Sequence, residues 1–88
     1  MFKITFNQNT SVYAFDSREF NIKYIAQQEL YVNDLLKVRG YVYINQIYEL
    51  FGVKWDPQRE NLCLLYNGNN HIDFNIHSVG NGFEITIG

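Results

Sequence analysis

The chain has 88 residues, enough for one domain, since domains usually run from about 50 to 250 residues. Its 47% hydrophobic and 18% charged residues exclude a disordered chain, and the 17% aromatic residues provide large side chains for the core of a small domain. The net charge of −2, with neither sign gathered into a run, argues against a nucleic-acid partner and against a mimic of nucleic acid.

Residues 2–7 alternate apolar and polar side chains, the pattern of a strand with one buried face. Residues 8–10 are turn-prone, and residues 11–15 contain Val12, Tyr13 and Phe15. The first 15 residues therefore predict an N-terminal β-hairpin.

A long helix is expected next, because Asp16 or Ser17 can cap its start and Gly40 can end it after about Val38. A helical projection predicts the buried face, which comprises Phe20, Tyr24, Tyr31, Leu35 and Val38, with Ile25, Val32 and Leu36 beside them. The solvent face comprises Lys23, Gln27, Glu29, Asn33, Asp34 and Lys37. Asn21, Gln28 and Arg39 form a polar strip between two apolar sectors, either dividing two packing partners or lying on an exposed flank.

Residues 41–43 read as a short strand, and the apolar spacing from Ile44 to Phe51 is helical. Asn45 is the expected N-cap of this short helix, and Gly52 is expected just beyond its end. Proline at position 57 removes an amide donor, so residues 53–61 are expected to form a loop.

The last third predicts a three-stranded β-meander over residues 62–66, 71–77 and 83–87, with turns at 67–70 and 81–82. A two-residue turn at 81–82 places Ser78 opposite Ile85 and Ile76 opposite Ile87. The element order predicts a single α+β domain over residues 1–88, in which the long helix packs across the apolar face of an antiparallel sheet. The apolar run 62–65 suggests a central strand covered on both sides.

Cys63 is the only cysteine and cannot form an internal disulfide, so the fold needs no oxidising compartment. It lies in the apolar run 62–65, which favours a buried thiol over a catalytic nucleophile. The N-terminal residues lack the features of a secretion signal, and no segment approaches the roughly 18 apolar residues of a membrane span. We therefore expect a cytoplasmic protein without membrane association.

Residue types that bind metals alternate along the predicted strand 71–77 and lie on the polar face of the predicted meander. They are His71, Asp73, Asn75 and His77, with Glu84 and Thr86 opposite. At about 3.3 Å per residue, His71 and His77 lie roughly 20 Å apart and cannot share one ion. We expect no metal site, and instead a solvated sheet face on which His77 and Glu84 attract each other.

Nothing in the sequence indicates catalysis. The three serines and two histidines suggest no triad, and Ser17 is better explained as a helix cap. The chain has no Gly-rich phosphate loop and no His-Glu-x-x-His motif. We therefore expect no enzymatic activity and no cofactor.

The middle of the chain is rich in tyrosine and tryptophan, which are enriched at protein interfaces. Tyr48 fits the buried stripe of the short helix, whereas two of Tyr41, Tyr43 and Trp55 should be exposed. The predicted partner-binding surface comprises Tyr41, Tyr43, Trp55, Asp56 and Arg59, with Trp55 as its anchor beside a proline.

The segment from Gly40 to Gly52, GYVYINQIYELFG, followed by Trp55-Asp56-Pro57 and Ile72-Asp73-Phe74, resembles small uncharacterised proteins of phages and mobile elements of Gram-positive bacteria. The resemblance covers roughly residues 38–76. It implies no particular activity at any position. It implies an origin in a phage or mobile element. It also implies a mode of action found among small phage proteins, which bind a protein of the bacterial host, defence proteins included, and then block or redirect it.

The leading hypothesis is thus a small protein-binding module, with inhibition of a bacterial host or defence protein as its mode of action. A second hypothesis is a structural or assembly protein that self-associates through an edge strand, such as residues 2–7 or 83–87. A third is a binder of small molecules such as nucleotide signals, with an aromatic-lined pocket at a dimer interface.

Overall fold

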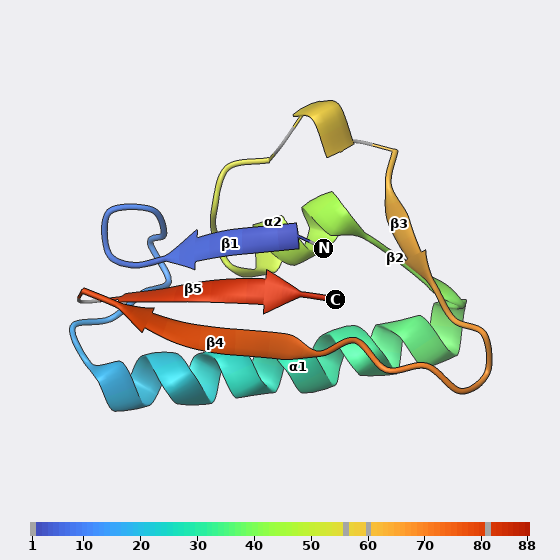
Figure 1. Ribbon diagram of the computed structural model, residues 1–88, viewed down its shortest axis with the longest axis horizontal. Coiled ribbons are helices and arrows are strands. Elements are labelled where there is room, and N and C mark those ends of the chain that lie inside the picture. The colour runs from blue at the N-terminus through green and yellow to red at the C-terminus, as the bar shows by residue number, and fades with distance from the viewer. Residues whose placement is uncertain (1, 56, 60, 81) are drawn as a thin grey trace.

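The computed structural model describes residues 2–55, 57–59, 61–80 and 82–88 and shows an α+β fold, as the element order predicts (Figure 1). The elements are β1 (Phe2–Phe6), α1 (Arg18–Arg39), β2 (Tyr41–Tyr43), α2 (Ile44–Leu50), a 3-10 turn (Pro57–Arg59), β3 (Cys63–Leu65), β4 (Phe74–Val79) and β5 (Gly82–Ile87). The strands form two antiparallel sheets, a three-stranded one in the order β1-β5-β4 and a two-stranded one of β2 and β3. Among the described residues, no helix combines the length and hydrophobicity needed to span a bilayer.

The predicted N-terminal hairpin is wrong, because β1 pairs with β5 and residues 11–15 form no strand. Those residues dock onto the two helices through side-chain hydrogen bonds. The Ser11 hydroxyl donates to the carbonyl oxygen of Phe51 just after α2, and the Asn21 side chain of α1 bonds both main-chain groups of Phe15, each at 2.9 Å. Both main-chain groups of Phe15 thus have hydrogen-bond partners without a neighbouring strand.

The predicted three-stranded meander is wrong in one strand, since β3 pairs with β2 and only β4 and β5 form a hairpin. In that hairpin Ser78 lies opposite Phe83 and Ile76 opposite Ile85, two residues from the predicted register. Val79 pairs with Gly82, and the connection begins at Gly80, whose φ of +59° lies in the left-handed region. A shift of two residues keeps every side chain on its predicted face.

The extent of α1 is as predicted, whereas its buried face is predicted correctly only in part. The Ser17 hydroxyl accepts the Phe20 amide at the start, and Gly40 ends the helix with a φ of +85°. Its buried residues are Asn21, Ile25, Val32, Asn33 and Leu36. Ile25, Val32 and Leu36 are buried as expected, whereas Phe20, Tyr31 and Val38 are exposed, so the buried face is centred on the expected flank and not on the expected middle.

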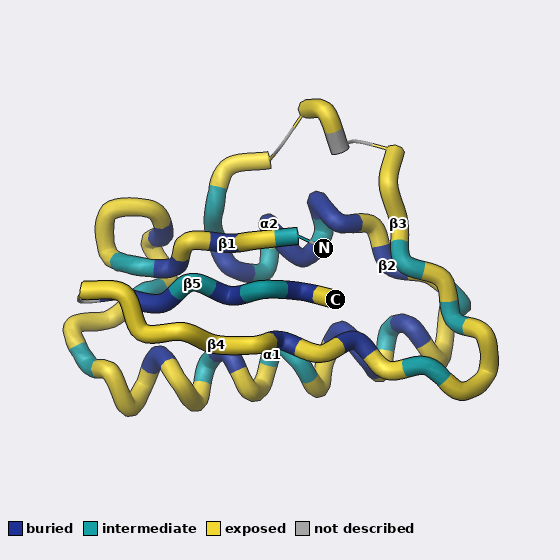
Figure 2. The backbone as a smooth tube through the Cα atoms, in the orientation of Figure 1, coloured by how far each residue is buried: buried dark blue, intermediate teal, exposed yellow. Residues whose placement is uncertain are grey.

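The core lies between the three-stranded sheet and the two helices. Phe6 of β1 packs its ring 5.4 Å from that of Phe51 and 5.7 Å from that of Tyr24. Figure 2 shows the buried positions of β1 and β5 against those of α1 and α2, while β4 is exposed over nearly its whole length. Tyr48 is buried as predicted, and α2 is preceded by Tyr43 as its N-cap rather than Asn45.

The β2–β3 ribbon stands apart from the three-stranded sheet, near the C-terminal end of α1 (Figure 1). The prediction of a doubly covered strand at 62–65 is therefore wrong, since β3 has one neighbour and its residues are exposed or half-buried. The predicted burial of Cys63 is wrong for the same reason, because its thiol is exposed.

Candidate functional site

An aromatic surface lies on the outer face of the β2–β3 ribbon. Side chains alternate across a strand, so Val42 and its partner Leu64 turn towards the core. Tyr41 pairs with Leu65 and Tyr43 with Cys63, and these four side chains share the opposite face. All four are exposed: Tyr41 by 38%, Tyr43 by 41% and Leu65 by 67%, together with the Cys63 thiol.

The two tyrosines are held by their surroundings. Their rings lie edge to face, 5.5 Å apart with an interplanar angle of 73°. The Arg39 guanidinium lies 5.3 Å from the centre of the Tyr41 ring and donates a 3.0 Å hydrogen bond to Gln46 Oε1. The same oxygen accepts the Tyr43 amide at 3.1 Å, so Gln46 ties Arg39 to the start of α2. The rings are therefore positioned before any partner arrives.

Trp55 joins this surface through a cavity of about 290 Å³. Its side chain is 52% exposed, so Tyr41, Tyr43 and Trp55 are all exposed, one more than the two expected. The cavity is lined by Tyr43, Asn45, Gln46, Trp55 and Asn61. The structure thus brings Tyr43 and Trp55 to one concavity, although 12 positions separate them in the sequence.

Two of the predicted site residues are not placed by the structure. Asp56 lies outside the described residues, and Arg59 is described only by its main chain, in the 3-10 turn Pro57–Arg59. Their membership of the aromatic surface stays a prediction.

Leu65 and Cys63 belong to the aromatic surface but were expected in a covered strand. Their exposure follows from the pairing of residues 41–43 with residues 63–65, which places the outward-facing side chains of both segments on one face of the ribbon. That pairing is not visible from either segment alone, since both are short and apolar.

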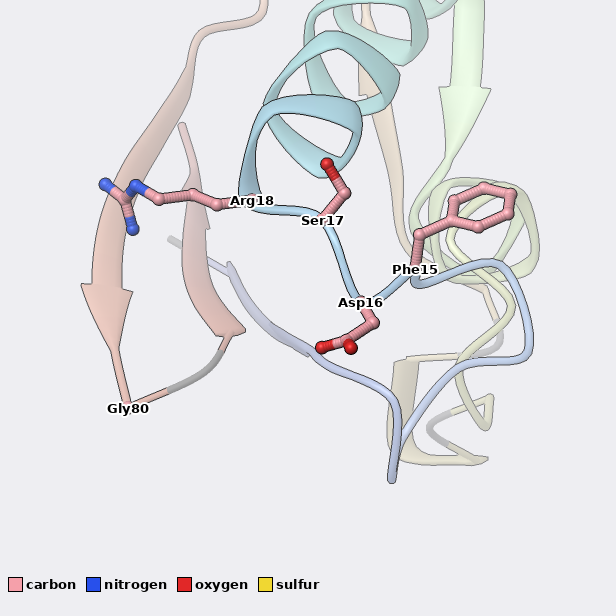
Figure 3. Close-up of a pocket in the computed structure, with 5 residues that line it drawn as sticks. All are labelled: Phe15, Asp16, Ser17, Arg18 and Gly80. Carbon is pink, nitrogen blue, oxygen red and sulfur yellow. The ribbon is translucent and has the colours of Figure 1, made fainter.

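A second cavity, of about 270 Å³, lies at the N-terminal end of α1 (Figure 3). It is lined by Phe15, Asp16, Ser17, Arg18 and Gly80. The Arg18 guanidinium lies 5.0 Å from the centre of the Phe83 ring. With its cation on an aromatic ring and a carboxylate alongside, this cavity lacks the convergent polar groups of a binding site.

One cluster of metal-ligand types is formed by Glu29 of α1 with His71 and Asp73. One donor atom from each residue lies within 4.8 Å of the others, a grouping that sequence reasoning missed because it compared His71 with His77. His71 and Asp73 are exposed, and one Glu29 oxygen accepts the Phe74 amide at 2.7 Å. His77 lies directly opposite Glu84, so these two side chains are neighbours on the sheet face as expected.

Tyr24 carries the one pKa shift that the described residues reveal. Its hydroxyl donates to the carbonyl oxygen of Leu50, and its ring packs against Phe6 and Phe51. Burial raises the pKa of Tyr24 above its usual value of 10.0, and the neighbouring Tyr13 raises it further. This tyrosine belongs to the core and not to the aromatic surface.

Comparison of the chain with protein-family models, with curated proteins and with solved structures found no match.

Proposed function

We propose that this protein is a small protein-binding module whose contact site is the aromatic surface of Tyr41, Tyr43, Trp55 and Leu65. The observation that carries the proposal is the cavity shared by Tyr43 and Trp55, which can receive an apolar side chain of a partner. Tyrosine, tryptophan and arginine dominate the binding energy of protein interfaces, and Arg39 lies at the edge of this surface.

Preorganisation supports the same proposal. A partner that docks on the tyrosine pair meets rings that are already positioned, because the Arg39 guanidinium lies over the Tyr41 ring and the two tyrosine rings pack edge to face. The cavity beside them has the amide side chains of Asn45, Gln46 and Asn61 at its wall, which suits the polar rim of a protein interface. Asp56 and Arg59 are proposed as rim residues of the same surface.

The proposed partner is a protein of a bacterial host, defence proteins included, which the module blocks or redirects. This part of the proposal rests on the resemblance of residues 38–76 to small phage and mobile-element proteins. The proposed mode of action, inhibition, requires only that the aromatic surface cover a working surface of the partner.

The test compares the wild-type protein with Trp55→Ala as bait in lysate of a Gram-positive bacterium. Phe20→Ala is the matched control, because Phe20 is also an exposed aromatic residue, at 64%, but lies on α1 away from the aromatic surface. We expect one protein to be captured by wild type and Phe20→Ala and lost with Trp55→Ala. Truncating an interface anchor costs about 2 kcal/mol or more, a loss of at least roughly thirtyfold in affinity.

Purified partner and titration calorimetry then measure the loss directly. Capture that survives Trp55→Ala would show that the aromatic surface is not the contact site. A Trp55→Ala variant that unfolds, judged by circular dichroism, would show that Trp55 belongs to the core, and Tyr43→Ala would then replace it in the same comparison.

A further inference from the structure

The outer edge of β4 has main-chain groups that nothing in the described chain satisfies. Asp73 and Gly88 exchange both of their main-chain hydrogen bonds, at 3.3 and 3.2 Å. Because hydrogen-bonded and non-hydrogen-bonded residue pairs alternate along antiparallel strands, this pair shows which main-chain groups of β4 bond to β5. The amides of Asn75, His77 and Val79 therefore point to β5. Those of Phe74, Ile76 and Ser78 point away from the sheet.

Helix α1 covers the beginning of this edge. The Asn33 side chain accepts the Ile72 amide at 2.8 Å and donates to the Ile72 carbonyl at 2.9 Å. One helical turn earlier, Glu29 accepts the Phe74 amide at 2.7 Å. These two side chains act as a partner strand for residues 72 and 74.

Beyond Phe74, the described residues of α1 offer no further hydrogen-bonding side chains to this edge of β4. Helical periodicity places Ala26 and Ile22 on the same stripe of α1 as Glu29 and Asn33, one and two turns further back. Neither side chain can form a hydrogen bond, and within the described residues the amides and carbonyls of Ile76 and Ser78 have no partner. Ile22 and Ile76, exposed by 39% and 38%, leave apolar surface beside this open edge.

The other outer edges are more protected. At β1, the Thr10 hydroxyl donates to the Thr5 carbonyl at 2.7 Å, and the Tyr48 hydroxyl lies 3.4 Å from the Lys3 carbonyl. Strand β3 is three residues long, and Asn70 donates to its Leu65 carbonyl at 2.8 Å. Strand β4 has six residues without lysine or proline, the residues that commonly guard an edge.

We propose that a second copy of this chain pairs with β4 through the same strand, antiparallel and about a two-fold axis at His77. In this register Ile76 of each copy faces Ser78 of the other, so the open amides and carbonyls of both residues are all used. A register with Ile76 facing itself would set Ser78 opposite Phe74, whose amide Glu29 already holds. The register about His77 is thus the one that completes the ladder.

Charge permits this self-pairing. Two-fold pairing sets like residues near each other, which is unfavourable for a charged edge. Residues 74–79, FNIHSV, include no lysine, arginine, aspartate or glutamate, so no such charges oppose each other across the axis. Joining the two sheets gives one continuous sheet with three strands from each copy, and covers Ile22 and Ile76.

Amide hydrogen exchange of the wild-type protein, followed by NMR at several concentrations, tests the proposal without a variant. We expect the Ile76 and Ser78 amides to exchange more slowly as concentration rises. Those of Asn75 and His77, bonded to β5, serve as internal controls that are protected throughout. Fast exchange of Ile76 and Ser78 up to about 1 mM, a concentration that detects even weak pairing, would overturn the proposal.

Sedimentation equilibrium of two variants gives the second test. Ser78→Pro removes an outward amide that β5 does not use, and Ser78→Ala keeps that amide while losing the same hydroxyl. We expect a dimer for wild type and Ser78→Ala, and a monomer for Ser78→Pro with a folded spectrum. A dimer that survives Ser78→Pro, or concentration-dependent protection at Cys63 and Leu65 instead, would overturn the assignment to β4.

Discussion

Asn33 holds Ile72 as a neighbouring strand would, with its amide oxygen on the Ile72 N–H at 2.8 Å and its amide nitrogen on the Ile72 carbonyl at 2.9 Å. Asn33 is 5% exposed and Ile72 is 3% exposed, so these bonds form away from water. The same nitrogen also donates to the Glu29 carbonyl at 2.9 Å. One polar side chain thus fixes the segment between β3 and β4 to the middle of α1.

We predict that Asn33→Ala destabilises the protein by about 2 to 3 kcal/mol, because both Ile72 groups lose their partner in a buried place. Urea unfolding followed by circular dichroism measures the free energy of unfolding. Asn75→Ala is the control, since Asn75 is exposed on β4, and we expect a change within about 0.5 kcal/mol. Equal losses for the two variants would contradict the role of the Asn33 side chain.

Gly82 at the start of β5 has no room for a side chain. A Cβ atom there would lie 2.5 Å from Asn7 Cβ and 2.6 Å from the Phe6 carbonyl oxygen. We predict that Gly82→Ala costs about 1 to 3 kcal/mol by overpacking and separates the end of β1 from β5. Thermal unfolding measures the loss, and Gly88→Ala, which meets no atom within 4 Å, is the matched control.

The raised pKa of Tyr24 gives a pH dependence of stability. Above pH 10 the unfolded chain releases the Tyr24 proton while the folded chain retains it, so stability falls as the pH rises until the folded pKa is passed. We predict that the free energy of unfolding drops more steeply between neutral and alkaline pH for wild type than for Tyr24→Phe.

At neutral pH Tyr24→Phe should lose about 1 kcal/mol, the contribution of the hydroxyl bond to the Leu50 carbonyl. Because other tyrosines titrate as well, the difference between the two proteins is the quantity to measure. Tyr31→Phe controls for an exposed tyrosine. Parallel curves for wild type and Tyr24→Phe above pH 10 would contradict the prediction.

The limits of α1 were predictable because helix ends carry local signals, a serine cap at Ser17 and a glycine at position 40. Its buried face was predictable only in part, because Asn33 was assigned to solvent and Asn21 to a polar strip between two apolar sectors. Asn21 is buried because it bonds main-chain groups of Phe15 in the preceding loop, and Asn33 because it bonds those of the distant Ile72. Hydrophobicity alone carries no information on such bonds.

The candidate site was partly predictable. Tyr41, Tyr43 and Trp55 were expected at the surface because so small a domain cannot bury them all with Tyr48, and the structure exposes them. Leu65 and Cys63 were missed because their exposure depends on which strand β3 pairs with. An apolar run of this length fits a strand covered on both sides as well as it fits the exposed strand beside β2.

The sequence by itself determined the α+β class, the limits of α1 and the alternation that separates the two faces of β4 and β5, because caps, turns and periodicity act over a few residues. Tertiary structure alone decided that β1 pairs with β5 and β2 with β3, and that the outer edge of β4 is open beyond Phe74. Main-chain hydrogen bonds are nearly the same for every strand, so pairing is chosen by how the whole chain buries its apolar side chains.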